Sequence, residues 1–416
     1  MKNNNYIVKL KYINLVILNH LHRIDNTLFD FGGNFLNTAG IICEYNPIHA
    51  GHVFHISETR RILGEDCGII CAMSGNFVQR GEPAIFSKYA RAKAAVLCGA
   101  DLVIELPVHV CLSSAEGYAI GGVTLLSATG VCTHLSFGCE CGDLEPLKTL
   151  AELKDSELVK QFIASGESYA SAFQLAADAV FPENAEALKS PNNLLAAEYL
   201  RALPDSIFPV AVKRTGSEHD GINSASEIRK ALLTDKTALG GIPENVRSIF
   251  EEEIKSGRAP VLPDSFENAV MYKLRTMSEE DYNALAGGNE GLGIRLMNAA
   301  NNSADLAEVL EKAKTKRYTM SRLRRLVLRA YLGINDAELN APCEYIRVLA
   351  IGKRGREILA QMKTSATLPV ITKPSSGLAI ASFRKNAKTD DLYALCCPDK
   401  NSRYAGVDLR TSPFVL

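Results

Sequence analysis

From Thr38 onward, short runs of apolar residues alternate with polar loops and with stretches of helical spacing. Gly40–Cys43 is the first apolar run, polar residues follow it, and apolar residues then recur at helical spacing over His52–Leu63. The same order repeats in Cys67–Met73, a continuous apolar run typical of a strand buried on both faces, and in the helical stretch Ser87–Leu97. The pattern therefore predicts successive strand–helix units.

These units continue to about residue 237. Further strands are predicted at Asp101–Leu106, His134–Gly138 and Ile207–Val212, and further helices at Ser113–Thr129, over most of 144–202 and at Ser224–Leu233. Strands that are almost continuously apolar and alternate with helices indicate a parallel sheet covered on both faces. We therefore predict an α/β fold with a Rossmann-like parallel sheet over residues 39–237.

Beyond Thr237 the strand pattern fades. Residues 240–360 are rich in Glu, Lys, Arg, Ala and Leu at helical spacing, and the tail after Leu368 is predicted to be a loop with a short closing strand or helix. We therefore expect a mainly α-helical C-terminal domain over 238–416. Residues 1–38 precede the pattern and are expected to be an appended extension, consistent with a start codon assigned too far upstream.

Composition and charge exclude several classes of protein. The chain has 416 residues, of which 47% are hydrophobic and 22% charged, so it is neither disordered nor fibrous. Its 46 Lys and Arg balance 47 Asp and Glu, and any attraction to nucleic acid must therefore be local. Tyr12–Leu18, the longest apolar run near the N-terminus, is far shorter than the roughly 18 residues of a membrane span. No membrane association is predicted.

The cysteines indicate a reducing compartment. There are 11 of them, scattered along the chain, and several stand inside apolar runs. An odd number without regular spacing does not predict a disulfide framework, and no Cys or His pairs stand at zinc-finger spacing. We therefore expect a cytoplasmic protein without a structural metal.

The sharpest chemical feature is GIICEYNPIHAGH, residues 40–52, between the first strand and the first helix. Ligands of open α/β sheets bind beyond the carboxyl ends of the strands. His49 and His52 would share one face near a helix start, and Gly51 would let a ligand approach the backbone, which predicts a polyphosphate site. Three alternatives stay open: a helix cap with a surface residue, packing residues, or a metal site with His55, although the spacing of an HExxH helix is missing.

Two further polar segments follow strands and so open onto the same edge of the sheet. The segment after the second strand carries Gln79, Arg80 and Lys88, which could contact phosphate, carboxylate or RNA, and Ser87 could cap the next helix. A solvated loop and helix is the alternative. KRTGSEHD at 213–220 and SASEIR at 224–229 follow the last strand, and a serine-capped helix with an arginine one turn later suits a phosphate.

A basic stretch covers Lys312–Arg329, in a helical setting with leucines on its apolar side. Such a local stretch suits the backbone of RNA, while a solvated helix face is the alternative. We expect RNA to be recognised by shape and charge, because no RRM, KH or zinc-knuckle signature is present. The stretch contains no acidic residue and eight basic ones, namely Lys312, Lys314, Lys316, Arg317, Arg322, Arg324, Arg325 and Arg329.

Six segments in one order resemble the bacterial tRNA(Met) cytidine acetate ligase family, part of the HIGH-type nucleotidyltransferase superfamily, whose members bind ATP on a Rossmann-like sheet. The resemblance covers about residues 39–416. One departure is Ile48, which stands where Phe is common in the family. The segments are EYNPIHAGH, MSGNFVQRGEPAIFSK, ADLVIELP, SPNN, KRTGSEHD and SASEIR.

The resemblance implies an ATP-dependent ligase that activates acetate as acetyl-adenylate, with Mg²⁺ expected on the phosphates. The acetyl group would then pass to N4 of the wobble cytidine of elongator tRNA(Met). His49 and His52 are the implied catalytic groups, acting with Arg214 on the phosphates. The implied ATP contacts are Ile42, Cys43, Glu44, Tyr45, Asn46, Pro47, Ile48, His49, Ala50, Gly51, His52, Val53, Phe54, His55, Gly138, Asn192 or Asn193, and Arg214.

Two other functions stay open. A small-molecule adenylyltransferase could use the same histidine site, although the basic stretch and the long second domain weigh against it. The second is a non-catalytic RNA-binding protein that keeps the nucleotide-binding fold without its activity. The intact His49, Gly51 and His52 weigh against this function. The acetate pocket and the oligomeric state do not follow from the sequence.

Overall fold

The computed structural model describes residues 37–153, 156–167, 169–180, 182, 191–214, 224–289 and 291–416. The predicted N-terminal extension lies outside these residues up to residue 36, and Thr38 already belongs to the first strand. The first residue of SPNN, at position 190, and residues 215–220 of KRTGSEHD are also outside the described part.

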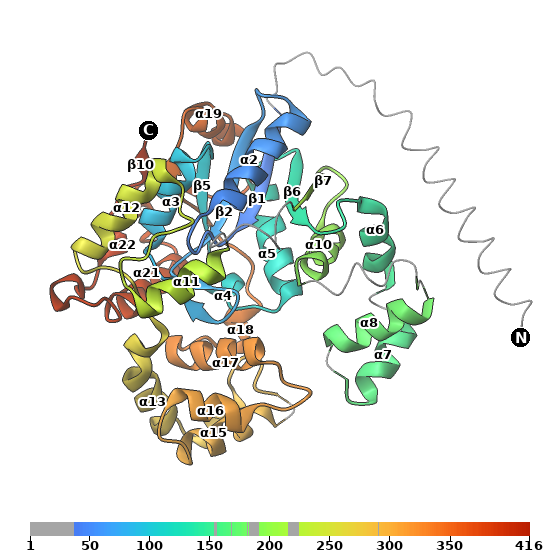
Figure 1. The fold of residues 1–416 in the computed structure, drawn as a ribbon, viewed down its shortest axis with the longest axis vertical. Helices are drawn as coiled ribbons and strands as arrows, with labels where there is room; N and C mark the ends of the chain where they lie inside the picture. Colours follow the sequence, from blue (N-terminus) through green and yellow to red (C-terminus); the bar gives the residue numbers. More distant parts are fainter. Residues whose placement is uncertain are drawn as a thin grey trace, which may run out of the picture. The chain divides into compact units, whose positions relative to one another are not determined.

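Five parallel strands form the centre of the described sheet, in the order β5-β2-β1-β6-β7 (Figure 1). They confirm the five predicted strands to within two residues. The chain runs outward from β1 to β5 and then returns past β1 to β6, so the strand order reverses between β1 and β6. This reversal is where such sheets bind ligands at their carboxyl edge. The bounds are β1 Thr38–Cys43, β2 Gly68–Ser74, β5 Leu102–Leu106, β6 His134–Cys139 and β7 Phe208–Lys213.

Helices cover both faces of the sheet, as the apolar strands predict. One apolar core lies under α2 (Ala50–Leu63), α3 (Lys88–Leu97), α11 (Ala225–Thr234) and α12 (Glu244–Lys255). A second lies on the opposite face, under α5 (Ala115–Ala128), α10 (Pro191–Ala202) and α19 (Gly355–Ser365). Every residue of β2 between them is buried, which explains its unbroken apolar sequence.

The helix-rich stretch predicted over 144–202 contains α6 (Leu144–Leu153), α7 (Glu157–Ala164) and α8 (Tyr169–Val180) before α10. Leu150, Val159 and Phe173, one from each of these three helices, form a small apolar cluster of their own. This cluster is separate from the two cores that flank the sheet. Leu147 of α6 belongs instead to the core under α10, so α6 joins this cluster to the sheet.

The C-terminal part is mainly helical, as predicted, but it also contributes strands to the same sheet. β8 (Ile346–Ile351) lies antiparallel beside β5, and β9 (Val370–Ile371) and β10 (Phe414–Val415) pair with β8. The expectation of helix throughout 240–360 is therefore wrong at β8. All six residues of β8 are buried, but helical sequence surrounds this short run and hid its signal. The division of the chain into domains at residue 237 stays a prediction.

A group of helices follows α12, and its core includes part of the loop after β2. Phe77, in the hairpin of β3 (Phe77–Val78) and β4 (Glu82–Pro83), belongs to the same apolar cluster as Leu296 and Leu326. These helices lie together in Figure 1. They are α13 (Glu267–Thr276), α14 (Glu279–Asn283), α15 (Leu292–Asn301), α16 (Leu306–Ala313) and α17 (Met320–Leu332), preceded by the 3-10 turn η2 (Pro263–Phe266).

Gly81 allows α17 to pack directly on this hairpin. Its φ is +79°, which strongly favours glycine, and a Cβ there would lie 2.6 Å from the backbone nitrogen of Arg325. The helical group is therefore in contact with the segment that leaves the carboxyl end of β2. The remaining elements are the long helix α21 (Ala381–Ala394) and the short α4 (Val108–Cys111), α18 (Asp336–Leu339), α20 (Pro374–Gly377), η3 (Lys400–Ser402) and α22 (Val407–Arg410).

Candidate functional site

The predicted ATP-binding residues come together at the carboxyl edge of the sheet, beside the reversal between β1 and β6. Residues 42–55 are the end of β1, the loop after it and the first turns of α2. Gly138 lies in β6, Arg214 directly follows β7, and Asn192 and Asn193 open α10. Hydrogen bonds and an ion pair link α2, β6, the end of β7 and the start of α10. The strand topology therefore assembles one site from distant segments.

The loop between β1 and α2 is held from three sides. Arg91 of α3 donates to the backbone oxygen of Glu44 at 2.6 Å, and Ile85 N–H donates to Asn46 Oδ1 at 2.8 Å. Arg229 of α11 donates to the backbone oxygen of Asn46 at 2.8 Å. These bonds fix the direction in which the chain enters α2.

His49 and His52 form a reciprocal cap at the start of α2. His49 is the N-cap residue, and its Nδ1 accepts a hydrogen bond from Gly51 N–H at 3.1 Å. His49 N–H in turn donates to Nδ1 of His52 at 3.3 Å, and the two ring centroids lie 3.9 Å apart. Two histidines thus occupy the positions that Ser or Thr and Glu usually hold in a capping box. The cap predicted as an alternative is confirmed for His49, and it fixes the orientation of both rings.

The cap also fixes which nitrogen carries the proton. Each Nδ1 accepts a hydrogen bond, so the proton of the neutral ring is on Nε2. Burial, with the charge of Arg214, lowers the pKa of His49 to about 4, and burial with the neighbouring His49 and His55 lowers the pKa of His52 well below its usual value. Among the described residues, neither Nε2 has a hydrogen-bond partner. The start of α2 therefore offers two neutral N–H donors beside its own amide groups, an arrangement suited to phosphate.

His55 lies further along α2 and has a different setting. Its Nε2 is 2.9 Å from Ser136 Oγ of β6, and Ser136 Oγ is 2.7 Å from Thr59 Oγ1. As for the metal alternative, no group of three His, Cys, Asp or Glu side chains that could hold a metal ion occurs in the described part of the chain. His55 is thus tied to β6, while His49 and His52 cap the helix.

The opposite side of the site is built around Glu140, which follows β6. Its N–H donates to Asn193 Oδ1 at 2.9 Å, and its Oε1 accepts from Asn192 Nδ2 at 2.6 Å. The same Oε1 lies 3.7 Å from Nε of Arg214, whose side chain is 50% exposed. Glu140 is therefore a functional candidate that was not selected from the sequence; its position in the polar loop directly after a predicted strand was the available signal.

Gly138 lies beside the side chain of Arg214. A Cβ at this position would lie 3.4 Å from Cγ of Arg214, which is the short end of van der Waals contact. Arg214 is anchored through its backbone, whose N–H donates to the oxygen of Cys139 at 2.9 Å. A side chain larger than hydrogen at Gly138 would therefore compete with Arg214 for the same space.

The start of α11 has the serine cap that SASEIR predicts, and the structure adds a return bond from Glu227 that completes a capping box. Ser224 Oγ accepts from Glu227 N–H at 3.2 Å, and Ser224 N–H donates to Glu227 Oε2 at 3.0 Å. Arg229, predicted as a phosphate contact, instead uses Nη1 on the loop after β1 and Nη2 on Ser226 Oγ. It positions the loop that carries His49.

Two residues of the loop after β2 and the following helix have structural roles. Lys88 is 0% exposed, and its Nζ lies 2.8 Å from Glu105 Oε1, 2.5 Å from Asp390 Oδ2 and 3.0 Å from Asp408 Oδ1. Three buried carboxylates of the protein itself surround Lys88. Its expected role in contacting the phosphate or carboxylate of a ligand, or RNA, is therefore wrong. Ser87 caps α3 as predicted, accepting from Ala90 N–H at 3.3 Å. Arg80 remains exposed.

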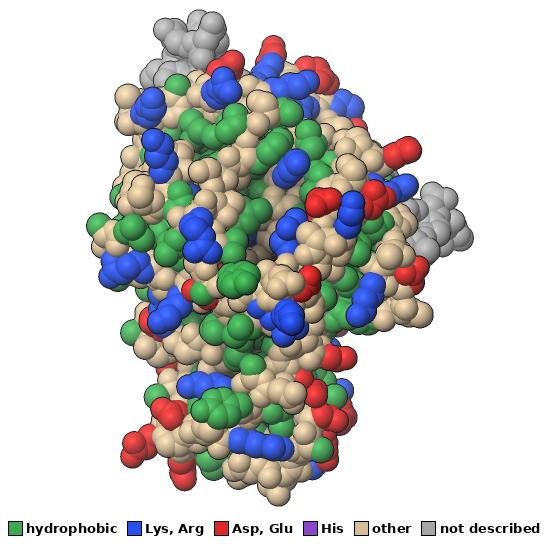
Figure 2. Space-filling model, turned by 90° about the vertical axis from the view of Figure 1, so that its left-hand side faces the viewer, with side chains coloured by type: hydrophobic (Ala, Val, Ile, Leu, Met, Phe, Trp, Pro, Cys, Tyr) green, Lys and Arg blue, Asp and Glu red, His purple; other side chains and the backbone are tan. Residues whose placement is uncertain are grey.

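The basic stretch is not one helix and not one surface. α16 ends at Ala313, residues 314–319 form a loop, and α17 begins at Met320. Arg329 is buried and donates to the backbone oxygens of Leu112 at 3.0 Å and Ala286 at 2.9 Å. The face in Figure 2 shows Lys and Arg spread among acidic and apolar side chains, without one basic band.

Two more arginines of α17 bind the hairpin. Arg325 is buried and donates to the oxygen of Gln79 at 3.1 Å, while Arg324, whose side chain is 40% exposed, pairs with Glu82. The expectation of a basic stretch that faces RNA is thus wrong for the buried Arg325 and Arg329. Lys314, Lys316 and Arg317, all in the loop before α17, are exposed.

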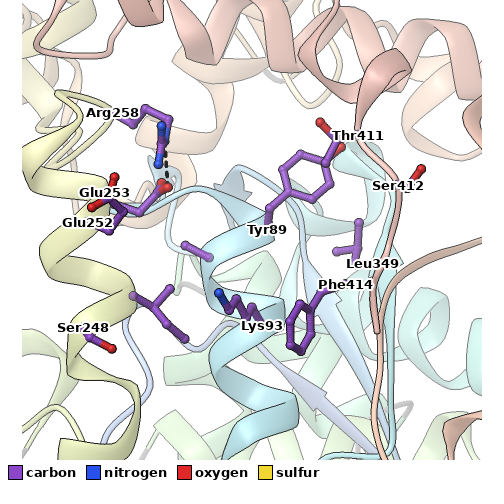
Figure 3. A pocket seen from close by; sticks show the side chains of 12 residues that line it. Tyr89, Lys93, Ser248, Glu252, Glu253, Arg258, Leu349, Thr411, Ser412 and Phe414 are labelled. Atoms are coloured by element: carbon purple, nitrogen blue, oxygen red, sulfur yellow. Dashed lines mark hydrogen bonds and ion pairs between the residues drawn. The ribbon is translucent and has the colours of Figure 1, made fainter. Parts of the chain in front are cut away.

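A cavity of about 430 Å³ lies elsewhere, between α3, α12 and the last strand (Figure 3). Its polar lining includes Lys93 and an ion pair between Arg258 and Glu253, at 2.7 Å. None of the predicted ATP-binding residues lines it, so it is distinct from the site at the carboxyl edge. Within the described residues, no helix has the length and apolar character needed to cross a membrane.

Comparisons with known proteins agree with this geometry. A sequence model described as HIGH nucleotidyl transferase matches residues 36–407. A tRNA(Met) cytidine acetate ligase of Acetivibrio thermocellus is 33% identical over 417 residues, covering 92% of this chain and 100% of its own. The enzyme of the same name from Thermoanaerobacter sp. strain X514 is 36% identical over 401 residues, covering 90% and 98%.

A solved structure matches as well. The crystal structure of Thermotoga maritima TmcAL bound with alpha-thio ATP superposes with a TM-score of 0.84 at 30% sequence identity. It covers 91% of this chain and 99% of that one. The likeness therefore extends through both the sheet and the helical part.

Proposed function

The chain belongs to the HIGH nucleotidyl transferases and, among them, to the tRNA(Met) cytidine acetate ligase family, and from this we propose that it acetylates N4 of the wobble cytidine of elongator tRNA(Met). It is an ATP-dependent ligase, and acetate is the proposed acyl donor. Work on tRNA would place it in the cytoplasm.

The observation that carries the proposal is the histidine cap at the start of α2. His49 and His52 direct their Nδ1 atoms to the backbone and leave both Nε2–H groups as donors. Arg214 adds a positive charge on the opposite side, where Glu140 holds it. Neutral donors, helix amides and one flexible cation together suit a triphosphate whose charge shifts during reaction.

In the first step, a carboxylate oxygen of acetate attacks the α-phosphorus of ATP. The bond from this phosphorus to the oxygen that bridges to the β-phosphorus breaks, and pyrophosphate leaves with that electron pair. Negative charge grows on the departing pyrophosphate and on the oxygens of the α-phosphorus. The Nε2–H groups of His49 and His52 and the guanidinium of Arg214 would stabilise that charge, and Mg²⁺ would enter on the phosphates of the substrate.

In the second step, N4 of cytidine attacks the carbonyl carbon of acetyl-adenylate. AMP leaves with the electrons of the C–O bond, and N4 loses one proton. The amine is a weak nucleophile, so holding it against the anhydride would be the main contribution of the protein. The exposed residues Lys314, Lys316 and Arg317 are candidates for the tRNA backbone, because they do not occupy the buried positions that Arg325 and Arg329 fill.

The experiment is incorporation of labelled acetate into purified tRNA, with and without ATP. The expected result is ATP-dependent label in tRNA(Met) that nuclease digestion releases as N4-acetylcytidine. His52→Ala should reduce the label by 100-fold or more, since loss of a preorganised donor to a developing charge costs on the order of 10²–10³ in rate. Label that is independent of ATP, or unchanged in His52→Ala, would contradict the mechanism.

Acetate-dependent exchange of labelled pyrophosphate into ATP separates the two half-reactions. Exchange without tRNA is expected if acetyl-adenylate forms first. The alternative, a small-molecule adenylyltransferase, predicts exchange that requires a phosphorylated small molecule in place of acetate. A non-catalytic RNA-binding protein predicts tRNA binding with no exchange at all.

Two variants are compared in tRNA binding. One replaces Lys314, Lys316 and Arg317 together by Glu, and the other is the single replacement Arg80→Glu on the loop after β2. The triple variant should weaken binding and make its salt dependence shallower, because fewer counterions are released from the RNA. Unchanged affinity and slope would remove residues 314–317 from the proposed interface.

A further inference from the structure

The hydrogen-bond roles around His55 can be assigned atom by atom. Thr59 Oγ1 lies 2.8 Å from the backbone oxygen of His55, and a carbonyl oxygen only accepts, so Thr59 donates its single hydroxyl proton there. Thr59 Oγ1 also lies 2.7 Å from Ser136 Oγ and can only accept in that contact. Ser136 therefore donates its proton to Thr59.

The next contact places the proton of the imidazole. Nε2 of His55 lies 2.9 Å from Ser136 Oγ, which has already donated its own proton. His55 must therefore be the donor, and Nε2 is the protonated nitrogen. Burial, followed by the charge of Arg214, lowers the pKa of His55 to about 4, so the ring has one proton near neutral pH. Nδ1 of His55 consequently carries a lone pair.

His55 differs from the two capping histidines in which ring nitrogen bonds within the protein. His49 and His52 use Nδ1 as acceptor within the protein and offer Nε2–H outward. His55 uses Nε2–H within the protein and leaves Nδ1 as an acceptor. Phosphate oxygens at neutral pH are acceptors, so they suit the first pair and are repelled by the lone pair of His55.

Nδ1 of His55 has no partner among the described residues, and the ring lies between α2 and β6. The side chain is partly exposed. Ser136 and Gly138 are two residues apart in β6 and so face the same side. Gly138 has no side chain and lies nearer than Ser136 to the carboxyl end of β6, so only backbone stands on this face between Ser136 and Arg214, which follows β7.

We propose that Nδ1 of His55 accepts a hydrogen bond from the nucleoside part of bound ATP, either from a ribose hydroxyl or from the adenine amino group. His55 is then a specificity-determining residue, with Ser136 and Thr59 holding its proton on the far nitrogen. The proposal rests on ATP binding at the site above, and it assigns the three histidines of α2 to two different parts of the nucleotide.

The test is equilibrium binding of four nucleotides to the full-length protein, without acetate or tRNA. ATP is compared with 2′-deoxy-ATP, 3′-deoxy-ATP and inosine triphosphate, which lacks the amino group. The wild type should bind ATP about threefold to tenfold more tightly than one of these three, the range expected for one neutral hydrogen bond. His55→Ala should bind ATP more weakly by that factor and bind ATP and that analogue equally.

Two conservative variants report on the nitrogen involved. His55→Asn places a carboxamide oxygen near the position of Nδ1 and should restore part of the preference for ATP, while His55→Gln reaches towards Ser136 and should not. His134→Ala is the matched control, because His134 faces the same side of β6 but its Nδ1 is engaged by Thr133 Oγ1 at 2.9 Å. This control should keep the preference of the wild type.

The proposal is overturned if the wild type binds all four nucleotides equally, or if His55→Ala keeps the preference. Either result together with intact acetylation of tRNA would overturn only the role of His55. A retained nucleotide preference with no acetylation would instead contradict the proposed function, while supporting the assignment of His55.

Discussion

Lys88→Met would remove a buried ammonium group and leave its three carboxylate partners in place. Lys88 is 0% exposed, and its Nζ lies between 2.5 and 3.0 Å from Glu105, Asp390 and Asp408. Met has nearly the length of Lys and no charge, so the packing of α3 against β5 and α21 should change little. The effect of the substitution is therefore mainly electrostatic.

The expected loss is about 3–5 kcal/mol of unfolding free energy, the usual cost of removing one partner from a buried ion pair. That is a large part of the roughly 5–15 kcal/mol of a typical native protein. Burial raises the pKa of Asp390 to about 8 even though the charge of Lys88 opposes this. Without Lys88 the pKa of Asp390 should rise further, because desolvation would act without that opposition.

The sign of the pH dependence follows from linkage. A carboxyl whose pKa is higher in the folded than in the unfolded state adds most stability below its unfolded pKa, and this stability is lost as the pH rises through the folded pKa. The variant should therefore lose stability between pH 5 and 8 more steeply than the wild type. Urea unfolding followed by circular dichroism at pH 5, 6.5 and 8 measures both the loss and the slope.

Arg80→Met is the matched control, since Arg80 is an exposed basic residue of the preceding loop. It should change the unfolding free energy by less than about 0.5 kcal/mol, as is usual for surface substitutions. If Lys88→Met were within about 1 kcal/mol of the wild type, or had the same pH slope, the structural role of this lysine would be refuted.

Three further outcomes are expected. Arg329→Met should lower the unfolding free energy by about 2–4 kcal/mol, because it leaves two buried carbonyl oxygens without a donor, yet the salt slope of tRNA binding should not change in a filter-binding titration. Gly81→Ala should cost about 2–4 kcal/mol in urea unfolding, against about 1–2 kcal/mol for Gly64→Ala, which has positive φ but no atom near its Cβ. Stability should also fall as the pH drops from about 6.5 to about 4, since burial lowers the pKa of His49 and His55 to about 4 and the unfolded chain then binds more protons; His49→Gln should flatten this slope, and an unchanged slope would contradict it.

The centre of the fold and the helix start that carries His49 and His52 were predictable because their signals are local. β1, β2, β5, β6 and β7 are apolar runs bounded by polar loops, and each was predicted to within two residues. His49, Gly51 and His52 lie within four residues of one another, so one segment shows the whole helix start. Gly138 and Arg214 were instead implied by the family resemblance, since more than 70 residues separate each from the next.

β8 was missed because its signal is short and non-local. A run of six residues that is apolar except for Arg347, within helical sequence, gave no reason to expect a strand, and β8 is stabilised by pairing antiparallel with β5, about 240 residues earlier. The partners of Lys88 posed the same problem, because Asp390 and Asp408 are far along the chain. Neither the pairing of a strand with a distant neighbour nor the neutralisation of a buried lysine leaves a periodic pattern at the residue concerned.

The basic stretch shows why the number of charges alone did not identify a surface. Leu326 and Arg329 are three residues apart in α17 and therefore lie on the same face of the helix, so an apolar side and a basic side could not be separated from spacing. Whether an arginine of α17 is buried depends on whether hydrogen-bond acceptors lie opposite it. The backbone oxygens of Leu112 and Ala286 are buried opposite Arg329, and a guanidinium has enough donors to satisfy both. The basic residues of the loop before α17 are exposed, and they remain the better candidates for contact with RNA.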